Sequence, residues 1–474
     1  MMNSSFNGPF LPVKQQMRSL LTVLTLIGGL IPVALHADDN WPQFRGYAGS
    51  GIGSGDPPVD WDVETGQNVE WKTTIPGLGH SCPIVWGNRV FLTTAINSDT
   101  DKPAVETGWA GGAGESADDT GEWTWQVQCL QLDTGKTLWT ESTRRGVPTI
   151  KRHLKASHAN CTPATDGEHV VAFFGSEGLF CFNVNGDLIW KRDFGRLHSG
   201  PYDQEDLEWG FASSPIIHDG NVILQCDCLN TNFVVILDID TGDEIRRIDR
   251  QGEVATWSTP LVVITEDRAQ IVCNGYRQMA GYDLATGDTL WHLNNGGDVP
   301  VPTPLFANGL IYLTNGHGRS PVYAVTPAAT GDITPSESET GNNGLAWWQA
   351  RNGAYMPTPL ALEGLLYTCN DNGRLAVHDG MTGDLIYRQR VGTGTRTFSA
   401  SAVASGSHVY FTSERGQVTV IEAGPAFRQV ASNQLGGVVM ATPAIAGNRL
   451  LIRTVNSLFC FRTGEHTPRI LRSE

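Results

Sequence analysis

Arginine recurs beside glycine in four short polar turns of the second half of the chain. The turns are NGYRQ, NGHGR, NDNGR and SERGQ, and their arginines are Arg277, Arg319, Arg374 and Arg415. Guanidinium groups bind carboxylates through paired hydrogen bonds and stack on flat aromatic systems. If the fold brings these turns to one face, we expect a basic surface that binds a small anionic or planar ligand. The structural alternative is that each arginine is a solvated turn residue.

A second group of candidates precedes short apolar runs of the kind that form strands. The segments GLGHSCP, SHANCTP, EWGFASSP, ATWSTP and TRTFSAS carry His80, His158, Trp209, Trp257 and Arg396. Imidazole and indole rings offer flat surfaces and hydrogen-bond donors to a planar ligand. These residues also have a structural alternative, because a tryptophan at the start of a strand often packs in the core.

Nine cysteines are present, but their spacing favours packing over metal binding. The sequence contains no CxxC, CxxCH or HExxH motif, so it gives no support for zinc or c-type haem. Six of the cysteines occupy equivalent places in apolar runs, where we expect small buried residues. Cys82, Cys161 and Cys228 are the remaining candidates for a disulfide.

A repeated phrase predicts the elements that position these residues. A Ser/Thr-Pro step, or a close variant, precedes apolar residues at intervals of roughly 45 residues. Each step leads into a polar turn, an apolar run rich in β-branched residues, a second turn and a further run. A Thr-Gly turn and an aromatic residue follow, as in ATGDTLW at 285–291. Such runs are long enough for one strand each. The eight steps are CPIV at 82, TPAT at 162, SPII at 214, TPLV at 259, TPLF at 303, TPLA at 358, SAVA at 401 and TPAI at 442.

This repeated order of turns and apolar runs predicts an all-β fold, namely an eight-bladed β-propeller of four-stranded antiparallel blades. The last unit stops at FRTGEH without an outer strand, whereas TGQNVEW at 65–71 has the outer-strand phrase with no unit before it. We therefore expect an N-terminal strand to complete the last blade and close the ring, with Trp71 near Phe461. We assign 38–466 to this single propeller and 467–474 to a C-terminal tail.

The first residues of the chain predict export. Basic residues precede an apolar run at 20–35, and LHA at 35–37 offers a cleavage site. We expect 1–37 to be a signal peptide, with Met1 or Met17 as the start. The mature protein is then expected as a monomer in the periplasm or cell envelope, or secreted, with no membrane span. A formal net charge of −16 makes nucleic acid a poor partner.

The repeated phrases resemble a known family. The Thr-Gly and tryptophan phrases are similar to PQQ-type (pyrroloquinoline quinone) β-propeller repeats, which occur in quinoprotein alcohol dehydrogenases and in the propeller lipoprotein of the bacterial barrel-assembly machinery. WPQFRG at 41–46 and WSTP at 257–260 resemble exported bacterial PQQ-like repeat proteins. The resemblance runs from about Trp41 to Glu465, and its motif is specific for fold rather than function.

For a quinoprotein dehydrogenase the resemblance implies an adjacent Cys-Cys disulfide over the quinone, a tryptophan beneath it, calcium held by Glu, Asn and Asp, and an Asp base. This sequence has no adjacent cysteine pair and no motif on which those residues can be placed. We therefore assign no catalytic residue, no metal ligand and no certain cofactor. We expect a scaffold that binds a small ligand or an envelope protein without catalysis. The alternative is a PQQ-dependent alcohol or polyol dehydrogenase with an atypical pocket that binds PQQ with Ca²⁺. A propeller that binds carbohydrate or peptide through the loop 97–123 is a third possibility.

Overall fold

The computed structural model describes residues 39–99, 105–108, 115–294, 296–317, 320–336, 341–392, 397–464 and 469–471. The chain divides into Met1–His36 and Ala37–Glu474, and every described residue belongs to the second unit. The predicted signal peptide 1–37 thus lies outside the described residues, as does most of the predicted tail 467–474. Within the described part, no helix has the length and apolar character needed to cross a membrane.

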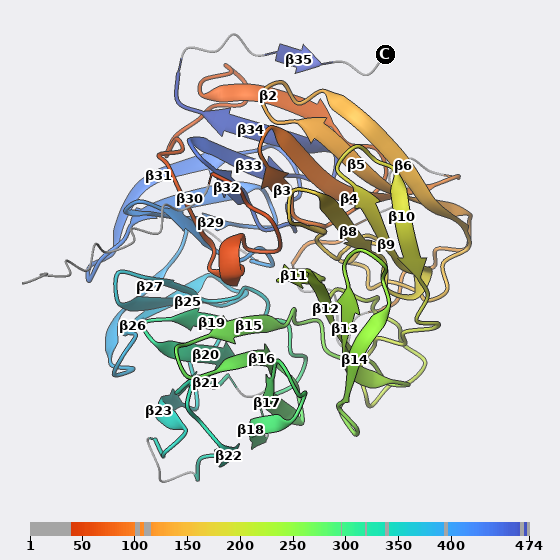
Figure 1. The fold of residues 1–474 in the computed structure, drawn as a ribbon. Coiled ribbons are helices and arrows are strands. Elements are labelled where there is room, and N and C mark those ends of the chain that lie inside the picture. Colours follow the sequence, from red (N-terminus) through yellow and green to blue (C-terminus); the bar gives the residue numbers. More distant parts are fainter. Residues whose placement is uncertain are drawn as a thin grey trace, which may run out of the picture. The chain divides into compact units, whose positions relative to one another are not determined.

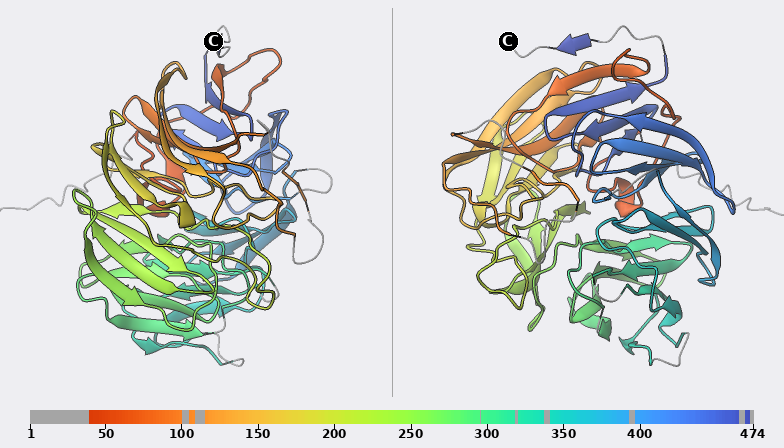
Figure 2. Two further views of the ribbon diagram at one scale, coloured as in Figure 1. Left: turned by 90° about the vertical axis from the view of Figure 1, so that its right-hand side faces the viewer. Right: turned by 180° about the vertical axis from the view of Figure 1, so that it is seen from behind.

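Eight sheets are arranged around a common centre, which confirms the predicted eight-bladed propeller (Figures 1 and 2). Each sheet contains four antiparallel strands that constitute one blade. Two short 3₁₀ segments, Tyr47–Gly49 and Gly175–Glu177, accompany the strands in the described residues. Blades 1 to 4 comprise β3 (Ile84–Trp86), β4 (Arg89–Asn97), β5 (Trp123–Gln131) and β6 (Thr137–Gly146); β7 (Ala164–Thr165), β8 (His169–Phe173), β9 (Leu179–Asn183) and β10 (Leu188–Arg192); β11 (Ile216–His218), β12 (Asn221–Asp227), β13 (Asn232–Asp238) and β14 (Glu244–Asp249); and β15 (Leu261–Ile264), β16 (Ala269–Cys273), β17 (Gln278–Asp283) and β18 (Thr289–Asn294).

The remaining four blades repeat the pattern and end where the chain returns to its beginning. Blades 5 to 8 comprise β19 (Leu305–Ala307), β20 (Leu310–Thr314), β21 (Val322–Val325) and β23 (Leu345–Gln349); β24 (Leu360–Leu362), β25 (Leu365–Cys369), β26 (Arg374–Asp379) and β27 (Leu385–Arg390); β28 (Val403–Ser405), β29 (His408–Thr412), β30 (Gln417–Glu422) and β31 (Arg428–Gln434); and β32 (Ala444–Ala446), β33 (Arg449–Arg453), β34 (Ser457–Arg462) and β2 (Val69–Thr74).

Strand β2 closes the ring, as the sequence predicts. It pairs antiparallel with β34, and Trp71 faces Cys460 in this register. Three short strands add parallel partners that the sequence did not predict: β1 (Ile52–Gly53) beside β28, β22 (Gly331–Asp332) beside β18, and β35 (Arg469–Leu471) beside β2. The outer edge of the last blade is therefore covered by a segment from the end of the chain.

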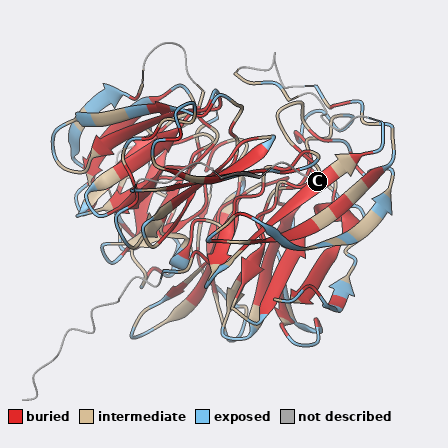
Figure 3. Cartoon of the chain, turned by 90° about the horizontal axis from the view of Figure 1, so that it is seen from above, coloured by how far each residue is buried: buried red, intermediate tan, exposed pale blue. Residues whose placement is uncertain are grey.

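The core lies between the blades. The second and third strands are buried almost throughout, whereas outermost strands such as β27 and β31 are mostly exposed (Figure 3). Stacking of neighbouring sheets buries both faces of each, which explains why these short strands carry apolar residues on both sides. All nine cysteines are buried and free, so none of the disulfide candidates is paired.

The recurring Thr-Gly turns lock one blade to the next. The indole of Trp190, in blade 2, donates a 2.6 Å hydrogen bond to the carbonyl of Ile239 beside the turn of blade 3. Gly242 in that turn has φ +71, and a Cβ there would lie 2.6 Å from the indole. Trp71, Trp139 and Trp347 make the same kind of hydrogen bond to the following blade. Glycine is thus required both by the backbone conformation and by the approach of the ring.

Candidate ligand-binding cup

The centre of the propeller contains a cavity of about 980 Å³, within the size range of small-molecule sites. Its wall comes from the segments that precede the inner strands and from loops between second and third strands. We call this cavity the cup. Its aromatic, sulfur-containing and charged lining residues are Phe44, His80, Cys82, His153, Lys155, Tyr202, Asp203, Trp209, Trp257, Asp298, His317, Tyr355, Met356, Asp371, Arg415 and Met440.

The N-terminal segment 41–53 lies against the inner strands and forms the floor of the cup. Trp41 exchanges two 2.8 Å backbone hydrogen bonds with Val85 of blade 1. Further along, Ile52 pairs with Ala404 of blade 7. Between these anchors Phe44 lines the cavity. The WPQFRG phrase is therefore the part of the sequence that turns a central channel into a cup.

A ring of side chains joins the blades around the cup. In seven of the eight Ser/Thr-Pro steps, the side chain of the first residue accepts a backbone N–H from the equivalent residue of the preceding blade. The donor–acceptor distances are 2.9–3.2 Å, and Thr303 is the member for which no such bond is found in the described residues. We call this set the hydroxyl ring, although one member is a thiol. Every member except Thr303 lines the cup. The members are Cys82, Thr162, Ser214, Thr259, Thr303, Thr358, Ser401 and Thr442.

Two buried arginines lie next to the hydroxyl ring. Arg45 donates to the carbonyl oxygens of Pro359 at 2.8 Å and Ala402 at 3.1 Å, which directly follow two ring members. Arg453 donates to the carbonyl and the hydroxyl of Ser81 at 3.0 and 2.6 Å, directly before Cys82. Burial lowers the pKa of each guanidinium to about 9, so both stay charged at neutral pH. Neither forms an ion pair within the part of the chain that the structure describes.

Aromatic side chains gather on one side of the cup. The rings of Trp209 and Trp257 lie 5.6 Å apart at 35°, and the indole of Trp257 donates 2.8 Å to the carbonyl of Gly210. His153 meets Trp209 edge-on at 5.6 Å. Offset and edge-on arrangements are the favoured ones for such rings. The pair gives the cup a partly exposed flat wall.

Charges in the cup are mixed. Lys155 donates 2.6 Å to Glu414 and 2.9 Å to the carbonyl of Gly108, while Thr397 and Ser399 donate to the same carboxylate. Three further carboxylates lie in the lining: Asp203, Asp298 and Asp371. Burial raises the pKa of Asp371. Among the described lining residues only Lys155 and Arg415 are permanent cations, and the first of them is already paired.

Two histidines of the cup, His80 and His153, are neutral at physiological pH. Burial, together with the nearby guanidiniums of Arg453 and Arg152, lowers the pKa of His80 to about 3. Burial and the charges of Lys155 and Arg152 lower the pKa of His153 to about 4. Groups with such low pKa values are weak proton acceptors at pH 7, so neither histidine is tuned for general base catalysis.

One segment of the wall is strained. Val299 lines the cup with φ +52, a conformation rare for a β-branched residue. Its neighbour Asp298 has a buried Oδ1 without a hydrogen-bond partner among the described residues. Strained backbone of this kind costs about 1–3 kcal/mol and clusters at functional sites.

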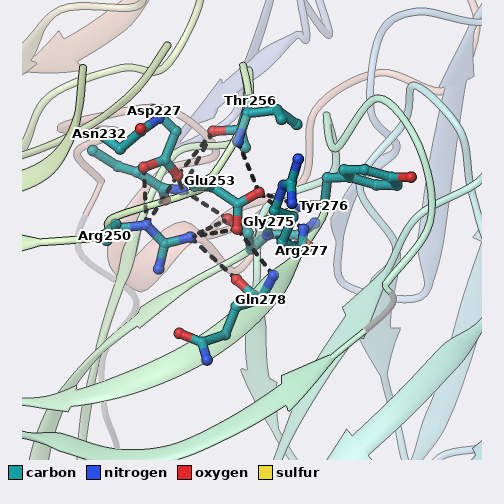
Figure 4. Close-up of polar contacts among 12 residues, drawn as sticks. Asp227, Asn232, Arg250, Glu253, Thr256, Gly275, Tyr276, Arg277 and Gln278 are labelled. Atoms are coloured by element: carbon teal, nitrogen blue, oxygen red, sulfur yellow. Dashed lines mark hydrogen bonds and ion pairs between the residues drawn. The ribbon is translucent and has the colours of Figure 1, made fainter. Parts of the chain in front are cut away.

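A buried carboxylate holds the loop between β16 and β17. Glu253 accepts hydrogen bonds from the backbone N–H groups of Tyr276, Arg277 and Gln278 at 2.9–3.2 Å (Figure 4). Arg250 lies between this carboxylate, at 3.6 Å, and that of Asp227, at 2.9 Å. The turn NGYRQ is therefore fixed through its backbone, and Arg277 is left exposed.

The insertion 97–123 supports the cup by ion pairs. Asp119 accepts 2.6 Å from Arg152 and lies 3.0 Å from Nε2 of His158. His158 packs its ring edge-on against Trp123 at 4.7 Å, and it does not line the cup. Asp118 pairs with Lys151 at 3.5 Å. Asp118 and Asp119 of this loop thus serve structural contacts.

The predicted ligand-binding residues separate into three groups. His80, Trp209, Trp257 and Arg415 line the cup. Arg277 and Arg374 are exposed, and neither they nor His158 belong to the lining. Arg319 and Arg396 lie outside the described residues. Ligand binding by any member of the set remains a prediction.

Sequence reasoning missed Phe44, Arg45, Arg453 and the hydroxyl ring. The Ser/Thr-Pro step served only to align the repeats, although a hydroxyl in seven of its eight first positions was a usable signal. An arginine inside the apolar run LLIRTV was another. Both signals point to polar groups that the fold must bury and satisfy.

The described residues do not form a carboxylate-rich calcium site. Calcium takes six to eight oxygen ligands, several of them carboxylates. No group of three or more His, Cys, Asp or Glu side chains comes together to hold a metal within the described ranges.

The chain is similar to a known protein family and to several solved structures. A family model described as outer membrane protein assembly factor BamB matches residues 124–389. No curated protein matches the chain in sequence. Among solved structures, a europium-containing methanol dehydrogenase has a TM-score of 0.58 at 10% identity, over 88% of this chain and 90% of that one. BamB from Moraxella catarrhalis gives 0.37 at 12% identity, over 83% and 98%. A quinohemoprotein alcohol dehydrogenase from Comamonas testosteroni gives 0.44 at 11% identity, over 92% and 82%.

Proposed function

Because this chain belongs to the family described as outer membrane protein assembly factor BamB, we propose that it is a binding scaffold of the cell envelope rather than a catalyst. Its binding site is the cup, and its ligand is a small molecule with a planar part. An envelope protein docked on the same face is the alternative partner.

The observation that carries the proposal is a cup of about 980 Å³ whose lining includes Phe44 of the N-terminal segment and the Trp209–Trp257 pair. Such a cavity is large enough to bury most of a small organic molecule. Trp209 and Trp257 offer their faces to a planar group. Glu414 ties Lys155, Thr397 and Ser399 of the wall to one another, so this part of the wall is preformed and needs little ordering when a ligand binds.

Three titratable groups of the cup, His80, Lys155 and Cys82, support binding without chemistry. The imidazole of His80 is a weak base, and Lys155 is held by Glu414. Burial raises the pKa of the Cys82 thiol, so it is a poor nucleophile. A catalytic acid, base or nucleophile needs a pKa near the working pH.

Export is part of the proposal, because an envelope scaffold must leave the cytoplasm. We expect cleavage after Ala37, and sequencing of the first residues of the mature protein from fractionated cells tests this. An uncleaved chain recovered with the cytoplasmic fraction would contradict the envelope assignment.

The competing function is that of a PQQ-dependent oxidoreductase. It is favoured by the similarity of the fold to the europium-containing methanol dehydrogenase and by the tryptophan wall. The two functions make different predictions for the same purified protein.

The deciding experiment is reconstitution of the full chain with PQQ and Ca²⁺, followed by absorbance, tryptophan fluorescence and dye-linked alcohol oxidation. We expect no turnover. Binding of PQQ or another planar ligand should quench tryptophan fluorescence. Trp257→Ala should weaken the affinity for that ligand about tenfold. Trp348→Ala is the matched control, because Trp348 lies on β23 outside the cup. Turnover would establish the oxidoreductase function. If the cup binds no planar ligand, the alternative partner, an envelope protein docked on the same face, remains.

A further inference from the structure

We propose that the hydroxyl ring is an oxyanion site that takes a carboxylate, sulfate or phosphate group deep in the cup. This inference rests on the proposed function, because it names the chemical group by which a ligand in the cup is held.

The ring presents hydrogen-bond donors that lack a partner. Ser214, Thr259 and Ser401 each accept a backbone N–H of a neighbouring blade, and their hydroxyl hydrogens reach no acceptor of another blade among the described residues. Their exposed fractions are only 2–4%, and all three line the cup. A buried donor without an acceptor costs free energy. Several such donors converging on one axis suit a ligand group with several acceptor oxygens.

The same part of the fold holds uncompensated positive charge. Arg45 donates only to carbonyl oxygens within the described residues, at Gly49, Ser50, Pro359 and Ala402. Arg453 donates to Ser81 and Thr93, and its Nε has no partner in the described structure. Burying a charge without a counterion is costly. An anion at the ring would offset that cost for both guanidiniums through the low-dielectric interior.

The distribution of acidic groups agrees with this location. The carboxylates of the lining, Asp203, Asp298 and Asp371, come from the mouth loops or from the segment preceding β19. The ring itself contains hydroxyls and one thiol. The two buried arginines contact groups directly beside the ring, whereas these three carboxylates belong to other segments of the wall, so the ring favours one compact oxyanion over an extended polyanion.

The test uses isothermal titration of the full chain with inorganic phosphate and, separately, with sulfate, at an ionic strength held constant with chloride. We expect saturable binding of one ion per chain. Ser401→Ala removes one donor and should weaken binding about tenfold. Ser401→Thr keeps the hydroxyl and should restore it.

The matched control is Ser413→Ala. Ser413 is equally buried and also accepts a backbone N–H, from Gln417 at 3.1 Å, but it does not line the cup. This variant loses the same kind of internal hydrogen bond and should bind phosphate as the unaltered protein does. Equal affinity of the Ser401→Ala and Ser413→Ala variants would overturn the assignment.

A gain of affinity provides a second, independent test. Cys82 is the one ring member whose side chain is a weak donor. Cys82→Ser adds a hydroxyl at that place and should tighten phosphate binding severalfold. Because this variant completes the ring, its result does not depend on destabilising the protein. Unchanged or weaker binding by a folded Cys82→Ser variant would contradict the proposal.

Binding of an aromatic carboxylate, 2-naphthoate, tests the oxyanion site and the planar-ligand function separately. If the carboxylate end of a ligand occupies the ring, both Ser401→Ala and Trp257→Ala should weaken naphthoate, whereas only Ser401→Ala should weaken phosphate. Binding of naphthoate that responds to Trp257→Ala alone would leave the planar-ligand function standing and refute the oxyanion site. Binding of phosphate without naphthoate would support the oxyanion site and refute the planar-ligand function.

Discussion

Glu253 illustrates how a single buried carboxylate serves the backbone of this protein. Three successive N–H groups of the turn at 276–278 converge on its two oxygens. Its charge is balanced by Arg250, which also contacts Asp227. A carboxylate accepts several hydrogen bonds at once, which no neutral side chain of that size can do.

Glu253→Gln should therefore lower the free energy of unfolding by about 2–4 kcal/mol, because the amide NH₂ would face backbone donors and Arg250 would lose a counterion. Urea denaturation measures the effect. Glu244→Gln is the control, since Glu244 forms an exposed pair with Arg247 and should change stability by less than about 1 kcal/mol. Equal losses in the two variants would contradict the role given to Glu253.

At this scale the sequence predicted residue types better than residue roles. It indicated Trp257, Trp209 and His80 because aromatic and imidazole groups before strands stand out. The sequence also pointed to four arginines in turns as ligand-binding candidates. Among the described residues, only Arg415 of these lines the cup. Sequence spacing places a turn on a face of the fold, but the direction of a long side chain depends on tertiary contacts such as those of Glu253.

At the scale of elements, the Thr-Gly turn of one blade and the outer-strand tryptophan of its neighbour together form a contact that joins the two blades. The tryptophan of one blade docks on the turn of the next, and the glycine leaves room for the ring. Blade 3 lacks the tryptophan, and there Arg246 and Ile248 approach Gly287 instead. The sequence showed the recurrence of the phrase, but not that its two halves belong to different blades.

Gly242→Ala should destabilise the protein by about 2–4 kcal/mol, because alanine suffers both at φ +71 and from the indole of Trp190. Gly220→Ala is the matched control. Gly220 has φ +72 with no atom near the new methyl group, so only the backbone cost of about 1 kcal/mol is expected. Thermal unfolding of the two variants isolates the contribution of the docked ring, and equal melting temperatures would argue against it.

At the scale of the whole molecule, an acidic residue of the closing strand fastens the ring. Glu70 of β2 accepts 2.6 and 3.0 Å hydrogen bonds from Arg449 of β33 and lies 3.2 Å from Arg462 of β34. Burial opposes ionisation of Glu70, but the hydrogen bonds and charge of these arginines outweigh it and lower its pKa below the ordinary 4.5.

This pKa shift predicts an acid-sensitive closure. A carboxyl whose pKa is lower in the folded state stabilises the protein above its unfolded pKa, and that stability is lost as pH falls through the folded value. The stability gap between the unaltered chain and Glu70→Gln should therefore be constant near pH 7, at about 1–2 kcal/mol, and shrink below pH 4.5. Urea unfolding across that range measures it, and a gap that widens in acid would be inconsistent with this account.

The sequence predicted the architecture almost completely, because an eightfold period leaves few alternatives. The missing outer strand of the last unit located β2 and its pairing with β34. The floor formed by 41–53 and the added strands β1, β22 and β35 were not predicted, because these segments are short and lie outside the period. Their positions depend on contacts with strands that are distant in the sequence, such as that between Ile52 and Ala404.

The closing strand has a consequence for biosynthesis. Strand β2 is made before any blade is complete, yet its partner β34 is made only after the strands of the seven other blades. A nascent chain must therefore carry an unpaired strand through the assembly of seven blades, and the terminal blade offers a bare edge until the two meet. Such long-range pairing is slow and exposes the chain to mispairing with its neighbours. We expect refolding to be limited by this last step, and to lose yield as protein concentration rises.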